Sequence, residues 1–161
     1  MKYKLNYKRI LKTDLIAILI CIVSFLGINF LNFKIPLNRL ASGNGNLAYL
    51  GFPFAIGSSI LIVILSTLLF LNLMRNQSKV LAALCLIVSI GLFIYLYFSF
   101  VEFFEAKVDY FGGPPSDPNS FIVDMGWFNA YTNDMYFNIY SFLFVLALPL
   151  AISCIVKLVR R

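Results

Sequence analysis

The charged residues of this 161-residue chain are spaced so that four long stretches carry no charge at all. The uncharged stretches hold 19 residues between Asp14 and Lys34, 35 between Arg39 and Arg75, 22 between Lys79 and Glu102, and 22 between Asp134 and Lys157. A helix that rises about 1.5 Å per residue needs roughly 20 apolar residues to cross a hydrocarbon core of about 30 Å. Each stretch is therefore long enough for one membrane-spanning helix.

The composition agrees with a membrane protein. Hydrophobic residues make up 61% of the chain and charged residues only 12%, whereas soluble domains are about half apolar and about one quarter charged. The length fits a single domain, 1–161. The frequent Lys, Asn, Ile, Phe and Tyr are typical of an AT-rich bacterial genome.

The 35-residue stretch predicts one helix, because turn-forming residues at 42–46 and then Gly51 and Pro53 interrupt its first part. We therefore predict an all-α integral membrane protein with four transmembrane helices in a bundle. The expected spans are 15–33, 54–74, 80–100 and 137–158, with a long outer loop at 106–135. The first span exceeds the usual length of a signal-peptide core and no clear Ala-x-Ala site follows it, so we expect an uncleaved anchor.

The basic residues predict the orientation. Ten of the thirteen precede the first span, follow the fourth, or lie between the second and third. By the positive-inside rule, both termini are expected in the cytoplasm, in a multi-pass protein of the inner (cell) membrane. These residues flank spans instead of forming a patch on a soluble domain, so we expect contact with the lipid bilayer and no nucleic-acid partner.

Missing residue types exclude several chemistries. The chain has no histidine, which excludes Ser-His and Cys-His catalytic pairs and most catalytic zinc sites. Cys21, Cys85 and Cys154 fall singly inside predicted spans, where they act as small packing residues. We expect no cofactor and no metal. No acid is predicted near the bilayer centre, which disfavours a proton relay.

The long outer loop carries the most informative sequence. Gly112 and its neighbours through Pro115 stop any helix, yet an apolar and aromatic run follows them. We predict an ordered cap over the outer mouth of the bundle, with Trp127, Phe128 and Tyr131 as candidate binding residues. Asp124 and Asp134 are expected near the same mouth.

Three further acids, Glu102, Glu105 and Asp109, have spacings that place them on one helical face. Two interpretations stay open. They could bind a cation or a partner, or they could be the solvated face of a third helix that continues past the headgroups.

Short segments of the chain resemble the lipoprotein signal peptidases, which are membrane aspartyl enzymes. Ile122-Val123-Asp124-Met125 is similar to the segment around the first catalytic aspartate of that family, and Phe137-Asn138-Ile139 resembles the start of its second motif. Gly51 and Phe54 match a third motif. Where the family has its second aspartate, this chain has Ser141. The resemblance implies a peptidase that uses Asp124 with Asp134 as the neighbouring acid.

The sequence thus leads to three function classes. The first is a noncatalytic membrane protein whose outer loops bind a protein or lipid partner. The second is the aspartyl peptidase. The third is a small-molecule or ion carrier that works as an oligomer, because four helices leave little room for a central pore.

Overall fold

The computed structural model describes residues 6–32, 34 and 46–160, and within these ranges every regular element is a helix. The elements are α1 (Tyr7–Leu31), the short 3₁₀ helix η1 (Leu47–Gly51), α2 (Phe52–Met74), α3 (Lys79–Tyr110), the one-turn α4 (Asn133–Tyr136) and α5 (Ile139–Val159). Four of the resulting helical segments are long and apolar enough to cross a membrane. The prediction of an all-α protein with four such helices is confirmed.

Helix α1 begins well before the predicted span. It begins at Tyr7 instead of near residue 15, and the Asn6 side chain accepts a hydrogen bond from the Arg9 backbone amide at 3.2 Å. This N-cap satisfies one of the free amides of the first turn. Apolar length therefore predicted where a helix can lie in lipid, but not where the helix begins.

Helix α3 also extends past its prediction, to Tyr110 instead of residue 100, so the outer loop begins at Phe111 and not at residue 106. Its end is set by Gly112 and Gly113, which have φ values of +80° and +130°. The Gly113 amide donates to the Val108 carbonyl at 3.0 Å and the Gly112 amide to Asp109 at 2.9 Å. This pair of bonds is the Schellman pattern that ends helices at glycine.

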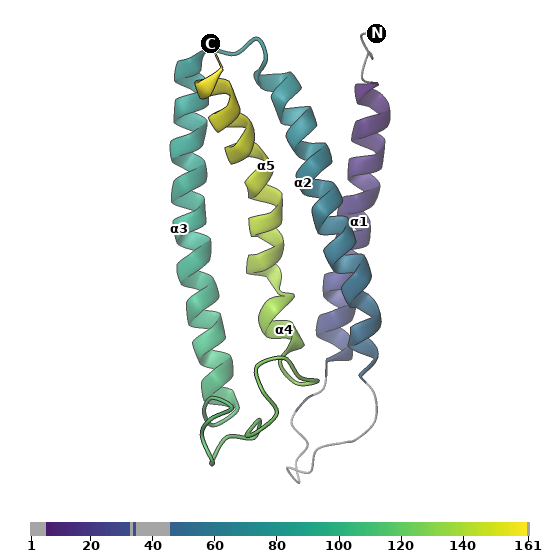
Figure 1. Cartoon of the computed structure of the whole chain (residues 1–161), viewed down its shortest axis with the longest axis vertical. Helices are drawn as coiled ribbons and strands as arrows, with labels where there is room; N and C mark the ends of the chain where they lie inside the picture. Colours follow the sequence, from purple (N-terminus) through teal and green to yellow (C-terminus); the bar gives the residue numbers. More distant parts are fainter. Residues whose placement is uncertain (1–5, 33, 35–45, 161) are drawn as a thin grey trace.

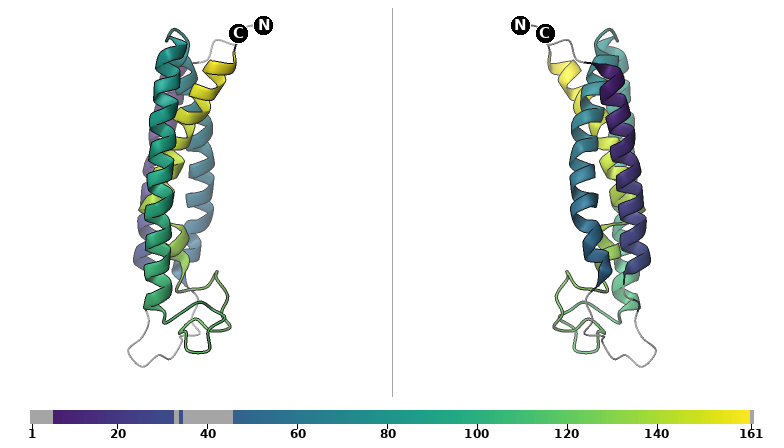
Figure 2. Two further views of the ribbon diagram at one scale, coloured as in Figure 1. Left: turned by 90° about the vertical axis from the view of Figure 1, so that its left-hand side faces the viewer. Right: turned by 90° about the vertical axis from the view of Figure 1, so that its right-hand side faces the viewer.

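The four long helices lie in a row, in the order α1, α2, α5, α3 (Figure 1). The last helix of the chain thus packs between α2 and α3, while α1 and α3 form the two edges of the row. The side views show the correspondingly narrow profile (Figure 2).

Small residues allow α1 and α2 to approach closely. Ala17 and Cys21 of α1 and Ala55 of α2 are buried, and the Cys21 sulfur lies 3.5 Å from the Ser59 hydroxyl. At the head of α2, a Cβ on Gly51 would lie 2.7 Å from Cγ1 of Ile28. Such stripes of small residues are the usual means of helix association in lipid.

Helix α5 contacts its two neighbours in different ways. It meets α3 through aromatic rings, with Phe93 and Phe144 centred 4.7 Å apart. It meets α2 through a hydrogen bond that the Ser153 hydroxyl donates to the Thr67 carbonyl at 3.3 Å.

The described residues have two distinct ends. The start of α1, the turn between α2 and α3, and the end of α5 lie together, and we call this the termini end (Figure 1). The opposite end carries the segment from Phe111 to Asn138, which we call the cap. This arrangement agrees with the up-and-down topology expected from the charges, and the assignment of the termini end to the cytoplasm stays a prediction.

Candidate functional site at the cap end

The cap is mounted on a helix that is longer than a membrane is thick. The 32 residues of α3 correspond to about 48 Å, against roughly 30 Å for the hydrocarbon core. About 12 residues of α3 therefore extend beyond the core if the helix enters it near Lys79. Phe104, Lys107 and Val108, which contact the cap, belong to this part of the helix.

The cap has its own small core. Phe111, Ile122, Tyr131 and Met135 are buried, and Phe104 and Val108 of α3 pack against them. The rings of Phe121 and Tyr131 meet edge to face at 4.9 Å. The loop is thus a folded unit and not an extended linker.

An ion pair fixes the cap to α3, and hydrogen bonds from Asn32 fix it to the end of α1. Lys107 Nζ lies 2.5 Å from Asp134 Oδ2, and the side chains are 28% and 13% exposed. The Asn32 amide, just after α1, donates to the other carboxylate oxygen of Asp134 at 3.0 Å and to the Tyr131 carbonyl at 3.0 Å. We call Lys107, Asp134 and Asn32 the cap node. It joins residues from three separate parts of the chain.

Two more asparagines from the first half of the chain hold the cap backbone. The Asn46 amide donates to the Ala130 carbonyl at 2.8 Å, and the Asn29 amide donates to the Phe137 carbonyl. Sequence analysis missed these contacts. Asparagines near the cap end of a predicted span were the available signal, but the sequence does not identify which carbonyl each side-chain amide contacts.

Part of the cap presents aromatic rings to the exterior. Trp127 is 40% exposed and Phe128 is 71% exposed. The Trp127 ring packs 5.4 Å from that of Phe104, and Phe128 stacks on Tyr136 at 4.2 Å with an angle of 11°. The Tyr136 hydroxyl donates to the Trp127 carbonyl at 3.0 Å. We call Trp127, Phe128 and Tyr136 the cap surface.

The predicted binding residue Tyr131 does not belong to this surface. It is 5% exposed and lies in the cap core with Phe111, Ile122 and Met135. The apolar stretch after Pro115 predicted that some of its aromatic rings are buried. Which rings are buried depends on the turns of the folded cap, which the sequence does not specify.

The two candidate aspartates have different surroundings. Asp124 is exposed and has a φ of +61°, a left-handed conformation that few non-glycine residues adopt. Among the described residues, the Asp134 carboxylate accepts from Asn32 and Lys107, and no hydrogen bond joins it to Asp124.

Local structure explains several residues of the segments that resemble the signal peptidases, and also Ser141, where the chain departs from that family. The Asn138 side chain accepts a hydrogen bond from the Ser141 backbone amide at 3.1 Å, and the Ser141 hydroxyl accepts one from the Asn138 backbone amide at 3.1 Å, which completes a capping box at the start of α5. Gly51 permits the contact with Ile28. Phe54 is 63% exposed. The roles of Asn138, Ser141 and Gly51 hold whether or not the chain is an enzyme, and Phe54 has no such role among the described residues.

The acids of α3 lie on its exposed surface. Glu102, Glu105 and Asp109 are all exposed, and within the described ranges none of them forms an ion pair. No group of three metal-ligating side chains is found among the described residues. Their exposure on the extended end of α3 fits the solvated face, the second of the two interpretations.

One buried acid was missed. Asp14, which sequence analysis placed outside the first span, lies within α1, is 4% exposed and accepts a hydrogen bond from the Ser66 hydroxyl at 2.7 Å. Its other oxygen is buried and has no partner among the described residues. Asp14, Ala17, Cys21 and Ser24 recur at helical spacing, and this pattern was the available signal.

Comparisons with known proteins do not extend these observations: a scan against protein-family models, a search of curated proteins and a search of solved structures each found no match.

Proposed function

We propose that this chain is a small multi-pass protein of the cell membrane that acts without catalysis, by binding a protein partner on its cap surface. The observation that carries the proposal is that exposed Phe128 stacks on Tyr136 while exposed Trp127 packs on Phe104 and its backbone carbonyl accepts a hydrogen bond from Tyr136. Large rings held in place bury much area on binding and lose little conformational freedom. Tryptophan and tyrosine are also the residues most often found at the centre of interfaces.

The charges at this end favour a protein over an anionic membrane surface. Six of the seven acids of the chain belong to the cap or to the end of α3. Glu102, Glu105, Asp109 and Asp124 are exposed there. Anionic headgroups would be repelled by these carboxylates, whereas a partner with basic residues around an apolar patch would complement them.

A photoreactive amino acid at position 128 tests the proposal in living cells. We expect a discrete protein adduct that disappears when Trp127→Ala is combined with the probe, because the tryptophan forms the adjoining part of the surface. A probe at Val88, which is 69% exposed in the middle of α3, is the control and should label lipid. Labelling of lipid alone at position 128 would contradict the proposal.

A second proposal follows from the resemblance to the signal peptidases. It is favoured by the left-handed backbone of exposed Asp124, since strained residues cluster at functional sites. It requires a second carboxyl group able to share a proton with Asp124, and Asp134 is already paired with Lys107. Loss of cleavage of a lipid-modified precursor in both the Asp124→Asn and the Asp134→Asn variants, with the fold retained, would favour this proposal over the first.

The third function class, a small-molecule or ion carrier, would need several copies of the chain, because a single row of helices surrounds no central pore.

A further inference from the structure

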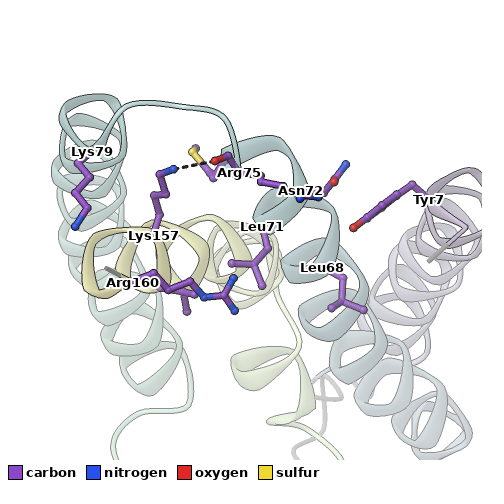
Figure 3. Close-up of a pocket in the computed structure, with 10 residues that line it drawn as sticks. Tyr7, Leu68, Leu71, Asn72, Arg75, Lys79, Lys157 and Arg160 are labelled. Carbon is purple, nitrogen blue, oxygen red and sulfur yellow. Dashed lines mark hydrogen bonds between the residues drawn. The ribbon is translucent and has the colours of Figure 1, made fainter. Parts of the chain in front are cut away.

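A basic pocket lies at the termini end, far from the cap. It has a volume of about 580 Å³ and is formed between the ends of α2 and α5, with residues from the start of α1 and of α3 at its margins (Figure 3). Its polar lining includes Arg75, Lys79, Lys157 and Arg160. Leu68, Leu71 and Val156 supply an apolar wall.

The four cations have no opposing side-chain carboxylate nearby. Apart from Asp14, every acid in the sequence belongs to the cap or to the far end of α3. Asp14 is buried against Ser66 and does not line the pocket. The one ion pair found among the described residues is the Lys107–Asp134 pair at the other end. Four positive charges around one cavity repel one another, so an anion placed among them would be stabilised.

Backbone carbonyls hold the two lysines in place. Lys157 donates to the Arg75 carbonyl at 2.9 Å, and Lys79 donates to the Leu158 carbonyl at 3.2 Å. These carbonyls lie at the ends of α2 and α5, where helices favour cations. Each ammonium group keeps further N–H donors. Arg75 and Arg160 are exposed, and Figure 3 shows the Arg160 side chain extending toward the α2 side of the pocket.

We propose that this pocket binds the phosphate group of an anionic phospholipid. Lysine and arginine donate charge-assisted hydrogen bonds to phosphate, and arginine does so with two parallel donors. A free phosphate ion has the same chemistry, but it leaves the apolar wall without a partner. A phospholipid fills both parts, since its phosphate meets the cations at the membrane surface while the first carbons of its chains contact the leucines and Val156.

Native mass spectrometry of the full chain in detergent tests the proposal, with phosphatidylglycerol and phosphatidylcholine as probes. We expect phosphatidylglycerol to bind roughly tenfold more tightly, because both lipids carry the same phosphate anion but the quaternary ammonium group of phosphatidylcholine would be repelled by the four cations of the pocket. The variant R75Q/R160Q should lose most of this preference. It leaves the two lysine contacts with the backbone intact, and R75K/R160K should restore part of the preference.

The variant K8Q/R9Q is the matched control. It removes two positive charges at the same end of the molecule, from exposed positions of α1 that do not line the pocket. An equal loss in this control would show that general charge attracts the lipid and would overturn the proposal. Equal binding of the two lipids would also overturn it, as would displacement of phosphatidylglycerol by millimolar inorganic phosphate, which would identify a site for the free ion.

Discussion

Replacing the charges of the cap node one at a time and together should reveal how strongly Lys107 and Asp134 stabilise the cap. Lys107→Met keeps most of the aliphatic stem and removes the ammonium group. Asp134→Asn keeps the shape of the side chain and an oxygen that can still accept from Asn32. The double variant completes a thermodynamic cycle in which only the interaction between the two charges is isolated.

The expected coupling follows from the exposure of the two side chains. Ion pairs in full contact with solvent contribute about 0–1 kcal/mol, and breaking a fully buried pair costs about 3–5 kcal/mol. At 28% and 13% exposure, the Lys107–Asp134 pair lies between these limits and is partly screened by water. We therefore expect a coupling energy of about 1–2 kcal/mol.

Hydrogen exchange of cap amides, with the protein in lipid nanodiscs, measures this coupling energy. The Tyr131 amide donates to Asn129 at 2.8 Å and the Met135 amide to Thr132 at 3.0 Å, so both should be protected by the folded cap. Each single variant should speed their exchange by about 5–30-fold, the factor that corresponds to 1–2 kcal/mol.

The exposed Glu105 supplies the control, because Glu105→Gln removes one charge from the same helix without breaking an ion pair found among the described residues. This variant should exchange like the wild type. The reasoning would be refuted if the effects of the two single variants simply added in the double variant. It would also be refuted if amides from 121 to 131 exchanged in the wild type like those of an unfolded peptide.

Three other measurements test different parts of the structure. Ser66→Ala removes the hydrogen bond to buried Asp14 and should lower the free energy of unfolding in detergent by about 1–2 kcal/mol; unchanged stability would mean that the carboxyl group finds another partner. Gly51→Ala places a Cβ 2.7 Å from the buried Ile28 of α1 and should lower the free energy of unfolding by about 1–3 kcal/mol. Gly57→Ala, whose Cβ meets nothing within 4 Å, should leave the stability unchanged or raise it slightly. Equal effects of the two variants would argue against the close contact at Gly51. A reporter inserted at Asn119 should be active only outside the cell, and one fused after the last residue only in the cytoplasm; an externally active C-terminal fusion would reverse the predicted orientation.

The sequence predicted the four helices because transfer into lipid depends mainly on the uninterrupted length of apolar chain. It did not predict that α3 runs to Tyr110, since its last turns lie among charged residues and are ended by the bonds of Gly112 and Gly113. Charge spacing alone placed the end of the span at residue 100, just before the first acid, Glu102.

The cap was predictable in outline but not in detail. A stop at Gly112 followed by many apolar residues requires a folded segment, and the structure contains one. The contacts of Asn29, Asn32 and Asn46 with the cap join residues about 80 to 110 positions apart. No local pattern encodes such pairings, because the helix order that brings them together depends on how all four helices pack.

The row order of the helices differs from their order along the chain, and this has a consequence for biosynthesis. Helices α2 and α3 are joined by a turn of only four residues, 75–78, yet α5 packs between them. While the ribosome is still making the cap, the surfaces of α2 and α3 that later receive α5 have only lipid or each other as neighbours. Helix α5, which is made after α2 and α3, must therefore enter between two helices already in the membrane. Until it does, α3 and the hairpin of α1 and α2 lack the contacts that α5 makes with both sides, and the 21 residues of α5 then join them into one domain.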